Sequence, residues 1–180
     1  MNKMFRPSFL GLLVLLVASC VKPQQSMQAQ ITDMEKVLFS DVSKIPNPAT
    51  ADSMIKMYVS YADQFQDDTL APEYLFRAGD IANGIGKPKD ALGYFGRVQR
   101  YPNYKKVSTA LFLQGFVSEN SLADIDGARR YYLKFLAQYP NHKLATDVKN
   151  SLANLGKTPE EMIRDFEAKS KNNSDSIKIK

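Results

Sequence analysis

The amino-acid sequence predicts an all-α fold in which about seven helices stack in pairs to form a solenoid. Two observations lead to this fold class. Landmark residues recur in the same order about 37 residues apart, and self-similarity at such a period is typical of helical repeat proteins. No segment of useful length alternates apolar and polar residues as a half-buried strand would. We therefore expect a repeat domain that follows an N-terminal leader.

The repeat rests on four landmarks that return in the same order at spacings of 36 to 38 residues. A fainter copy lies two periods upstream, beginning with the aromatic residues of 58–65. Chance does not readily produce four landmarks at so constant a spacing. The landmarks and their copies are 75–79 and 111–115, Ala91 and Ala128, Phe95 and Tyr132, and 101–103 and 139–141.

Residues 1–19 have the pattern of an export signal. Lys3 and Arg6 give a positive start, and an apolar run follows at 9–18. Ten helical residues extend about 15 Å, half of the roughly 30 Å hydrocarbon core, so the run is too short to span a bilayer. A basic start followed by a short apolar run is typical of a signal peptide. We expect this segment to be removed on export.

The only cysteine, Cys20, directly follows this run. Residues 16–20, Leu-Val-Ala-Ser-Cys, resemble the lipobox of bacterial lipoproteins, in which small residues precede an acceptor cysteine. The resemblance implies that Cys20 becomes the N-terminus and carries a diacylglyceryl group and a further acyl chain such as palmitate. Two or more chains anchor a protein stably. The alternative is an ordinary signal peptide whose small residues happen to precede a cysteine.

The segments after Cys20 are a tether and two helices. Residues 20–30 lack apolar periodicity, which predicts a flexible tether. The domain is expected over 31–168, beginning with a short helix near 31–39 and a longer one near 50–65. Pro46 and Pro48 separate these two helices, because proline is not tolerated in a helix interior.

Four further helices follow from local signals. Pro72 suits the first turn of a helix over 72–84, and residues 86–88, Gly-Lys-Pro, break the chain before a helix over 88–100. The next period predicts helices near 107–121 and 125–138. Asp124 is positioned to cap the second of these helices.

The C-terminal part is expected to hold two more helices and a tail. A helix over 144–155 should end at Gly156, which can adopt the left-handed conformation that ends helices. Thr158 and Glu161 form a capping box around Pro159, which predicts a last helix to about Ala168. Residues 169–180 are expected to be a disordered basic tail.

The repeat landmarks resemble the tetratricopeptide repeat, although the spacing exceeds its usual 34 residues and Gln114 and Ser118 replace large apolar residues. Together with the lipobox, they resemble the small tetratricopeptide-repeat lipoproteins of Bacteroidota, and more distantly BamD and YbgF. The resemblance implies a helical solenoid that binds proteins. The small and aromatic positions that pack the repeats are Gly79, Ala91, Phe95, Gly115, Ala128 and Tyr132.

The resemblance also implies a groove lined by the first helix of each repeat. Aromatic rings and amide or carboxylate groups there could hold a peptide or helix of a partner. The alternative is that Phe76, Phe112 and Phe116 are buried core residues between repeats and do not contact a partner. The candidate groove residues are Phe76, Asp80, Asn83, Phe112, Phe116, Glu119 and Asn120.

Composition and charge argue against several other functions. One cysteine and one histidine cannot supply a zinc cluster of four Cys and His ligands or a disulfide. His142 lies in an expected turn without a nucleophile constellation, so we expect no enzyme and no cofactor beyond the lipid on Cys20. The net charge of +5 owes two charges to the leader and two to residues 167–180, and residues 20–166 hold 18 basic and 17 acidic residues. Nucleic-acid binding needs positive charge on a folded face, so we expect no nucleic acid as a partner, and no small-molecule substrate is evident.

These features predict a noncatalytic, lipid-anchored adaptor that binds a protein or peptide of the cell envelope, in envelope assembly or maintenance. In enteric bacteria, Asp after the acylated cysteine favours the inner membrane, and Val21 is not Asp. We therefore expect attachment to the outer membrane on its periplasmic side. Two alternatives stay open. One is a surface-exposed accessory lipoprotein of a nutrient-uptake system, and the other is an accessory subunit of an envelope hydrolase.

Overall fold

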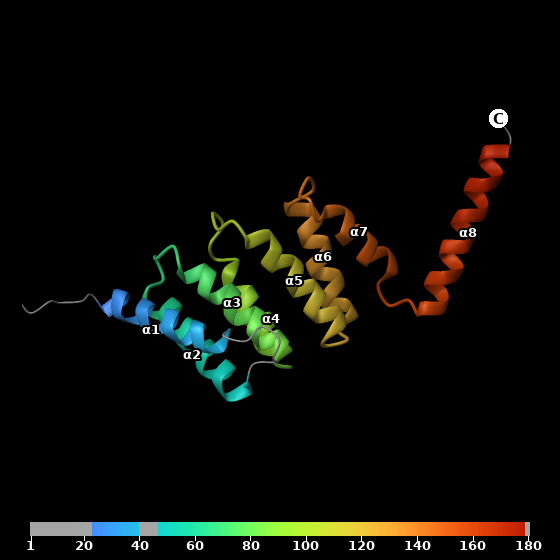
Figure 1. Ribbon diagram of the computed structural model, residues 1–180. Coiled ribbons are helices and arrows are strands. Elements are labelled where there is room, and N and C mark those ends of the chain that lie inside the picture. The colour runs from blue at the N-terminus through green and yellow to red at the C-terminus, as the bar shows by residue number, and fades with distance from the viewer. Residues whose placement is uncertain (1–22, 40–46, 179–180) are drawn as a thin grey trace, which may run out of the picture.

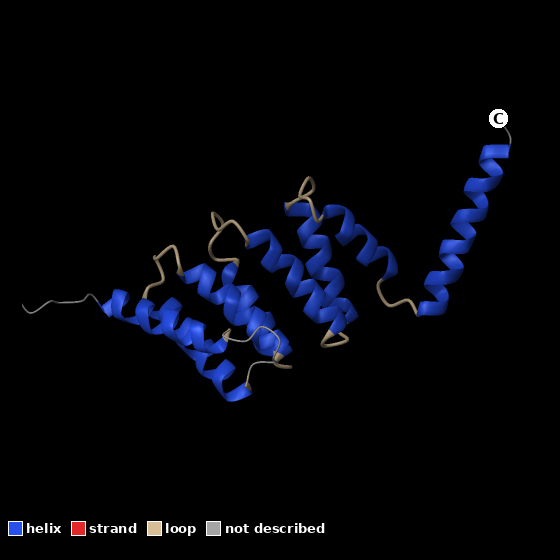
Figure 2. Cartoon of the chain, viewed as in Figure 1, coloured by secondary structure: helices blue, strands red, loops and turns tan. Residues whose placement is uncertain are grey.

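The chain forms a row of helices, so the predicted all-α class is confirmed. The computed structural model describes residues 23–39 and 47–178, with side chains as far as Ala168. Every regular element in these ranges is an α-helix (Figures 1 and 2). The eight helices are α1 Pro23–Leu38, α2 Pro48–Gln64, α3 Ala71–Gly84, α4 Pro88–Val98, α5 Val107–Asn120, α6 Ile125–Gln138, α7 Ala145–Asn154 and α8 Pro159–Lys178.

Helices α1 to α7 pack successively, each on the next, which is the arrangement of a solenoid. Helices α3 and α4 form one pair and α5 and α6 the next, in agreement with the two sequence periods. Helices α1 and α8 lie at opposite ends of the row, and α8 extends away from α7 (Figure 1). The leader and Cys20 lie outside the described residues.

Two apolar clusters form the core. The larger one joins α1 to α5, and the rings of Tyr58, Tyr61 and Tyr74 pack together in it with centroids 4.8 to 5.1 Å apart. The smaller one joins α5, α6 and α7 around Tyr132, Phe135 and other buried residues. The two polar departures from the repeat pattern, Gln114 and Ser118, are also buried on α5.

Small residues allow the two helices of each pair to approach closely. A Cβ atom added to Gly79 would lie 2.6 Å from Phe95 Cε1, and one added to Gly115 would overlap the ring of Tyr132. Ala91 and Ala128 are fully buried on the facing helices. The six residues expected to pack the repeats therefore all lie in the interior, since Phe95 and Tyr132 are buried too.

The predicted helix ends are present. The Asp124 carboxylate accepts a hydrogen bond from the backbone N–H of Gly127 at 2.9 Å. Thr158 and Glu161 form the reciprocal capping box, because each backbone N–H donates to the other side chain, at 2.9 and 3.3 Å. Gly156 has φ +80°, the left-handed conformation expected of a residue that ends a helix.

Both ends of the domain are more helical than the sequence predicted. Helix α1 begins at Pro23 rather than near 31, so most of the expected flexible tether is helical. The reason is tertiary contact, because the amides of Gln24 and Gln28 donate to the hydroxyl of Tyr61 at 3.1 and 2.6 Å. Helix α8 continues to Lys178 instead of giving way to a disordered tail after 168. No glycine or proline after Pro159 interrupts it.

Candidate partner-binding surface

The candidate groove residues lie on α3 and α5, the first helices of their pairs. Three of them, Asp80, Phe116 and Asn120, are exposed. Helix α1 lies beside α3, since the carboxylate of Glu35 pairs with the guanidinium of Arg77 at 2.5 Å. We call the exposed sides of α1, α3 and α5 the first-helix face.

The three candidate phenylalanines have different environments. Phe76 is 6% exposed and packs against Phe95 and Tyr104, with ring centroids 5.6 and 6.4 Å away. Phe112 is half-buried between Phe116 and Tyr132. Phe116 is 40% exposed. Phe76 is thus a core residue, and Phe116 can contact a partner.

Of the four polar candidates, three form hydrogen bonds among the described residues and one, Asp80, does not. Asn83 accepts a hydrogen bond from Ser121 at 3.2 Å, and Glu119 accepts one from the hydroxyl of Tyr132 at 2.7 Å. Burial, together with the bond to Glu119, raises the pKa of Tyr132, so this hydroxyl remains a donor. Asn120 donates its amide to the carbonyl of Phe116. The Asp80 carboxylate makes no hydrogen bond or ion pair within the described residues, and it is available to a partner.

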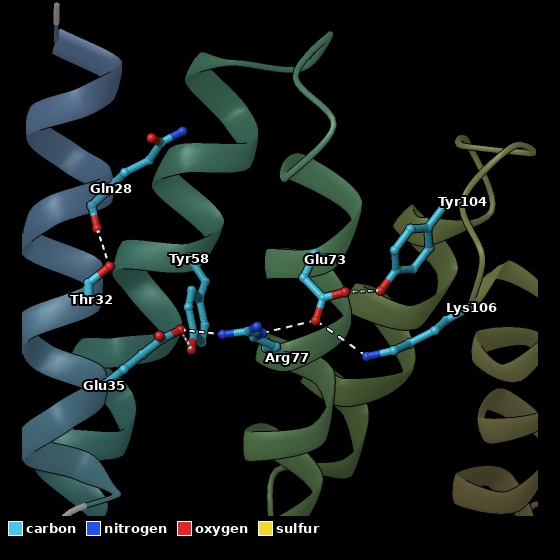
Figure 3. A network of polar contacts seen from close by, with 8 residues as sticks. All are labelled: Gln28, Thr32, Glu35, Tyr58, Glu73, Arg77, Tyr104 and Lys106. Atoms are coloured by element: carbon cyan, nitrogen blue, oxygen red, sulfur yellow. Dashed lines mark hydrogen bonds and ion pairs between the residues drawn. The ribbon is translucent and has the colours of Figure 1, made fainter.

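A polar network that the sequence did not predict crosses the first-helix face (Figure 3). Glu35 of α1 accepts hydrogen bonds from the Tyr58 hydroxyl and from Arg77, both at 2.5 Å. Arg77 also pairs with Glu73 at 3.0 Å, one helical turn before it. The network therefore fixes α1, α2 and α3 relative to one another. Only the spacing of Glu73 and Arg77, four residues apart on an expected helix, could have indicated it.

The network continues to the loop between α4 and α5. Glu73 accepts hydrogen bonds from the Tyr104 hydroxyl at 2.7 Å and from Lys106 at 3.3 Å, and the Lys106 ammonium lies 4.6 Å from the ring centroid of Phe76. Burial alone would raise the pKa of Glu73, but the hydrogen bonds from Tyr104 and Arg77 and the charge of Lys106 lower it to about 2. Glu73 is therefore ionised at neutral pH and links two repeats.

Two hollows lie on either side of this network, and Arg77 lines both. The larger, of about 870 Å³, lies between the α2–α3 and α4–α5 loops and includes Asp67, Arg100 and Tyr101. The smaller, of about 520 Å³, is mostly apolar. It is lined by Phe39, Tyr58, Arg77, Asp80, Ile81, Gly84 and Ile85. Asp80 is exposed as a whole residue, but desolvation of its carboxylate at the rim of this apolar hollow raises its pKa. An apolar side chain with a neighbouring basic group would fit this smaller hollow.

The described residues include one Ser–His pair, whose geometry does not suit catalysis. The Oγ atom of Ser108 lies 3.1 Å from Nε2 of His142, and Nδ1 of His142 accepts the backbone N–H of Leu144 at 3.2 Å. In the neutral ring the proton therefore sits on Nε2, which donates to Ser108. A general base needs the opposite arrangement, with Nε2 accepting from serine and Nδ1–H donating to an acid. This pair instead attaches the α6–α7 loop to α5.

Two other kinds of feature are absent from residues 23–39 and 47–178. No group of three or more His, Cys, Asp or Glu side chains in these ranges is placed to hold a metal ion. No helix among them is long and apolar enough to cross a membrane.

Comparison with known proteins agrees with the repeat architecture. The family model of the tetratricopeptide repeat matches residues 109–142, which cover most of α5, all of α6 and the turn after it. No curated protein matches the chain. The chain is therefore an all-α solenoid of paired helices that contains a tetratricopeptide repeat. Solenoids of this kind present extended surfaces to protein partners.

Proposed function

We propose that the chain is a noncatalytic adaptor that binds a protein partner on its first-helix face. The observation that carries the proposal is the pair of exposed residues Asp80 and Phe116, which occupy positions 36 residues apart on successive first helices. A carboxylate and an exposed aromatic ring at equivalent positions of adjacent repeats offer two different contacts to one extended peptide or helix. Aromatic anchors of this kind contribute much of the binding energy at protein interfaces.

We further propose that the adaptor is anchored by lipid on Cys20 to the outer membrane, faces the periplasm, and acts in envelope assembly or maintenance. The leader and the lipobox-like residues 16–20 support this location. The mass of the membrane-bound protein should correspond to a chain that begins at Cys20 and carries acyl groups. Cys20→Ala should release it from the membrane. A full-length soluble product with a free thiol would refute the anchor.

The alternative location is the cell surface, as an accessory lipoprotein of a nutrient-uptake system. In that class an acidic signal is expected just after the acylated cysteine, whereas residues 21–25 are Val-Lys-Pro-Gln-Gln. Protease treatment of intact cells separates the two locations. A periplasmic protein survives the treatment, and degradation would favour the cell surface.

The binding face can be tested by crosslinking in living cells. A photoreactive residue at Phe116 or Asp80 should trap the same partner, whereas one at Lys56, an exposed position on α2, should not. Phe116→Ala should reduce the yield of the crosslink formed at Asp80 while lowering the melting temperature by no more than a few degrees. Equal trapping at all three positions would contradict the proposed face.

A further inference from the structure

Helix α8 carries an apolar stripe that the other described residues leave uncovered. Met162, Ile163 and Phe166 are 39%, 59% and 72% exposed. Their spacing places them on one side of the helix, because residues three or four positions apart lie on the same face. Figure 1 shows why they are exposed, since α8 extends away from the solenoid.

The stripe has an acidic border. By helical geometry Glu160 and Glu167 lie next to Ile163, and neither carboxylate makes a hydrogen bond or ion pair among the described residues. The segment 159–168 holds four acidic residues and one basic residue, Arg164. A surface that complements this part of α8 must therefore be both apolar and basic.

The neighbouring helix of the same chain is not such a surface. Helix α7 buries Ala145 and Val148 against α6, and its exposed positions are polar or small. They are Thr146, Asp147, Lys149, Asn150, Ala153 and Asn154. This outer side resembles the polar cap that ends a repeat array. It therefore has no apolar surface against which the ring of Phe166 could pack.

Helix α6 has the required surface on its outer side. Leu133 is 54% exposed there. Arg129 and Arg130 lie one turn before it and Lys134 directly after it, so cations border the leucine on both sides. None of the three cations forms an ion pair within the part of the chain that the structure describes. The other basic residues near the network, Arg77 and Lys106, are paired with carboxylates.

We propose that α8 of one copy docks its apolar stripe on the outer side of α6 of a second copy, with Glu160 and Glu167 facing Arg129, Arg130 and Lys134. The contact is reciprocal in a twofold dimer, because each chain supplies one α6 and one α8. The proposed contact uses residues of α6 and α8 and none of the candidate residues on α3 and α5, so it does not depend on partner binding at the first-helix face.

Disulfide crosslinking tests whether α8 of one copy contacts α6 of a second copy. In full-length chains with Cys20→Ser, Leu133→Cys is placed in one tagged copy and Ile163→Cys in a second copy with another tag. Mild oxidation of the mixture should yield mainly the mixed dimer. The control replaces Leu133→Cys by Lys56→Cys, an exposed position on α2, and should yield little. A monomer with an internal disulfide, formed when both cysteines are in one chain, would overturn docking on a second copy.

Charge reversal tests whether the opposite charges on α6 and α8 stabilise the dimer. Sedimentation should show a dimer for the full-length chain, and Arg129→Glu with Arg130→Glu should raise its dissociation constant about tenfold or more. Adding Glu160→Lys and Glu167→Lys should restore the dimer. Lys56→Glu with Lys89→Glu, which reverses two exposed cations on α2 and α4, is the matched control and should have little effect.

Three results would overturn the proposal. The first is a chain that stays monomeric up to millimolar concentration. The second is a dimer that is insensitive both to reversal at α6 and to Phe166→Ser. The third is a monomer that binds phosphatidylglycerol vesicles through Arg129 and Arg130, because α6 would then face lipid. In each case partner crosslinking at Phe116 is unaffected, so failure of the dimer is distinguishable from failure of the adaptor function.

Discussion

Phe76 and Phe116 differ in what surrounds their rings, although both are aromatic residues on a first helix. Phe95, Tyr104 and the Lys106 ammonium surround Phe76, whereas 40% of Phe116 faces solvent. The sequence places both residues on the expected groove but does not separate core from surface. That difference depends on Lys106 and Tyr104, which come from a loop about 30 residues away, and such contacts have no local periodicity.

Truncating these two rings should have different consequences for stability. We expect Phe76→Ala to lower the free energy of unfolding by about 3–5 kcal/mol, because it empties a buried aromatic site. Phe116→Ala should lower it by about 1 kcal/mol or less, because part of the ring is already in water. Urea unfolding followed by circular dichroism measures both. Equal losses would mean that Phe116 is also a core residue.

The ionised state of Glu73 should make stability depend on pH. Its pKa is about 2 in the folded chain and 4.5 as a free side chain, so the unfolded state binds more protons between these values. The stabilisation is therefore fully present above about pH 5 and is lost as the pH falls towards 2. It amounts to at most about 3 kcal/mol.

Replacing Glu73 by a neutral side chain isolates the contribution of its carboxylate to the free energy of unfolding. The free energy of unfolding of the native chain should exceed that of Glu73→Gln at neutral pH, and the two values should converge near pH 2. Asp67→Asn, at an exposed carboxylate without a hydrogen bond, is the control and should show a smaller pH dependence. A constant difference between native chain and Glu73→Gln across the range would contradict the assignment.

At the scale of elements, helix ends and helix pairs were predictable, whereas the start of α1 was not. Pro72, Asp124 and Thr158 act through residues within a few positions, so their signals are visible in the sequence. Helix α1 depends on bonds from Gln24 and Gln28 to Tyr61, which are 37 and 33 residues away in the chain. A polar segment that becomes ordered by distant contacts looks the same in sequence as a tether.

The close approach of α3 and α4 predicts opposite effects for two glycines. Gly79→Ala places a Cβ atom 2.6 Å from the buried ring of Phe95, so we expect it to lower the free energy of unfolding by about 1–3 kcal/mol. Gly93, in the middle of α4, has no atom within 4 Å of an added Cβ. Gly93→Ala should therefore stabilise the chain by about 0.5–1 kcal/mol through helix propensity.

Thermal unfolding followed by circular dichroism distinguishes these two effects. The melting temperature should fall for Gly79→Ala and rise for Gly93→Ala. Phe95→Leu added to Gly79→Ala should recover part of the loss attributed to the clash, because the shorter side chain leaves room for the methyl group. If both alanine variants were more stable than the native chain, the two helices would not be in close contact at Gly79.

For the whole molecule, the sequence predicted the solenoid because a repeat encodes its fold locally. Each period carries its own helix pair and the small residues that close it, as at Gly79 with Phe95 and Gly115 with Tyr132. The candidate surface was predicted only in part. Phe116 and Asp80 were identified through the expected first helices, but Glu35 was not, because its contact with Arg77 joins residues 42 positions apart. No motif marks such a pair.

The division of the core into two clusters predicts that the two halves of the chain lose stability separately. In a repeat array each unit contacts only its neighbours, so a local defect propagates weakly. Val148 is buried in the cluster of α5 to α7, and Met54 in the cluster of α1 to α5. Val148→Ala should increase amide hydrogen exchange in α6 and α7 while leaving α2 and α3 protected, and Met54→Ala should do the reverse. Hydrogen exchange measured by mass spectrometry on both variants shows whether the two clusters lose stability separately. Faster exchange throughout the chain in either variant would mean that the solenoid unfolds as a single cooperative unit.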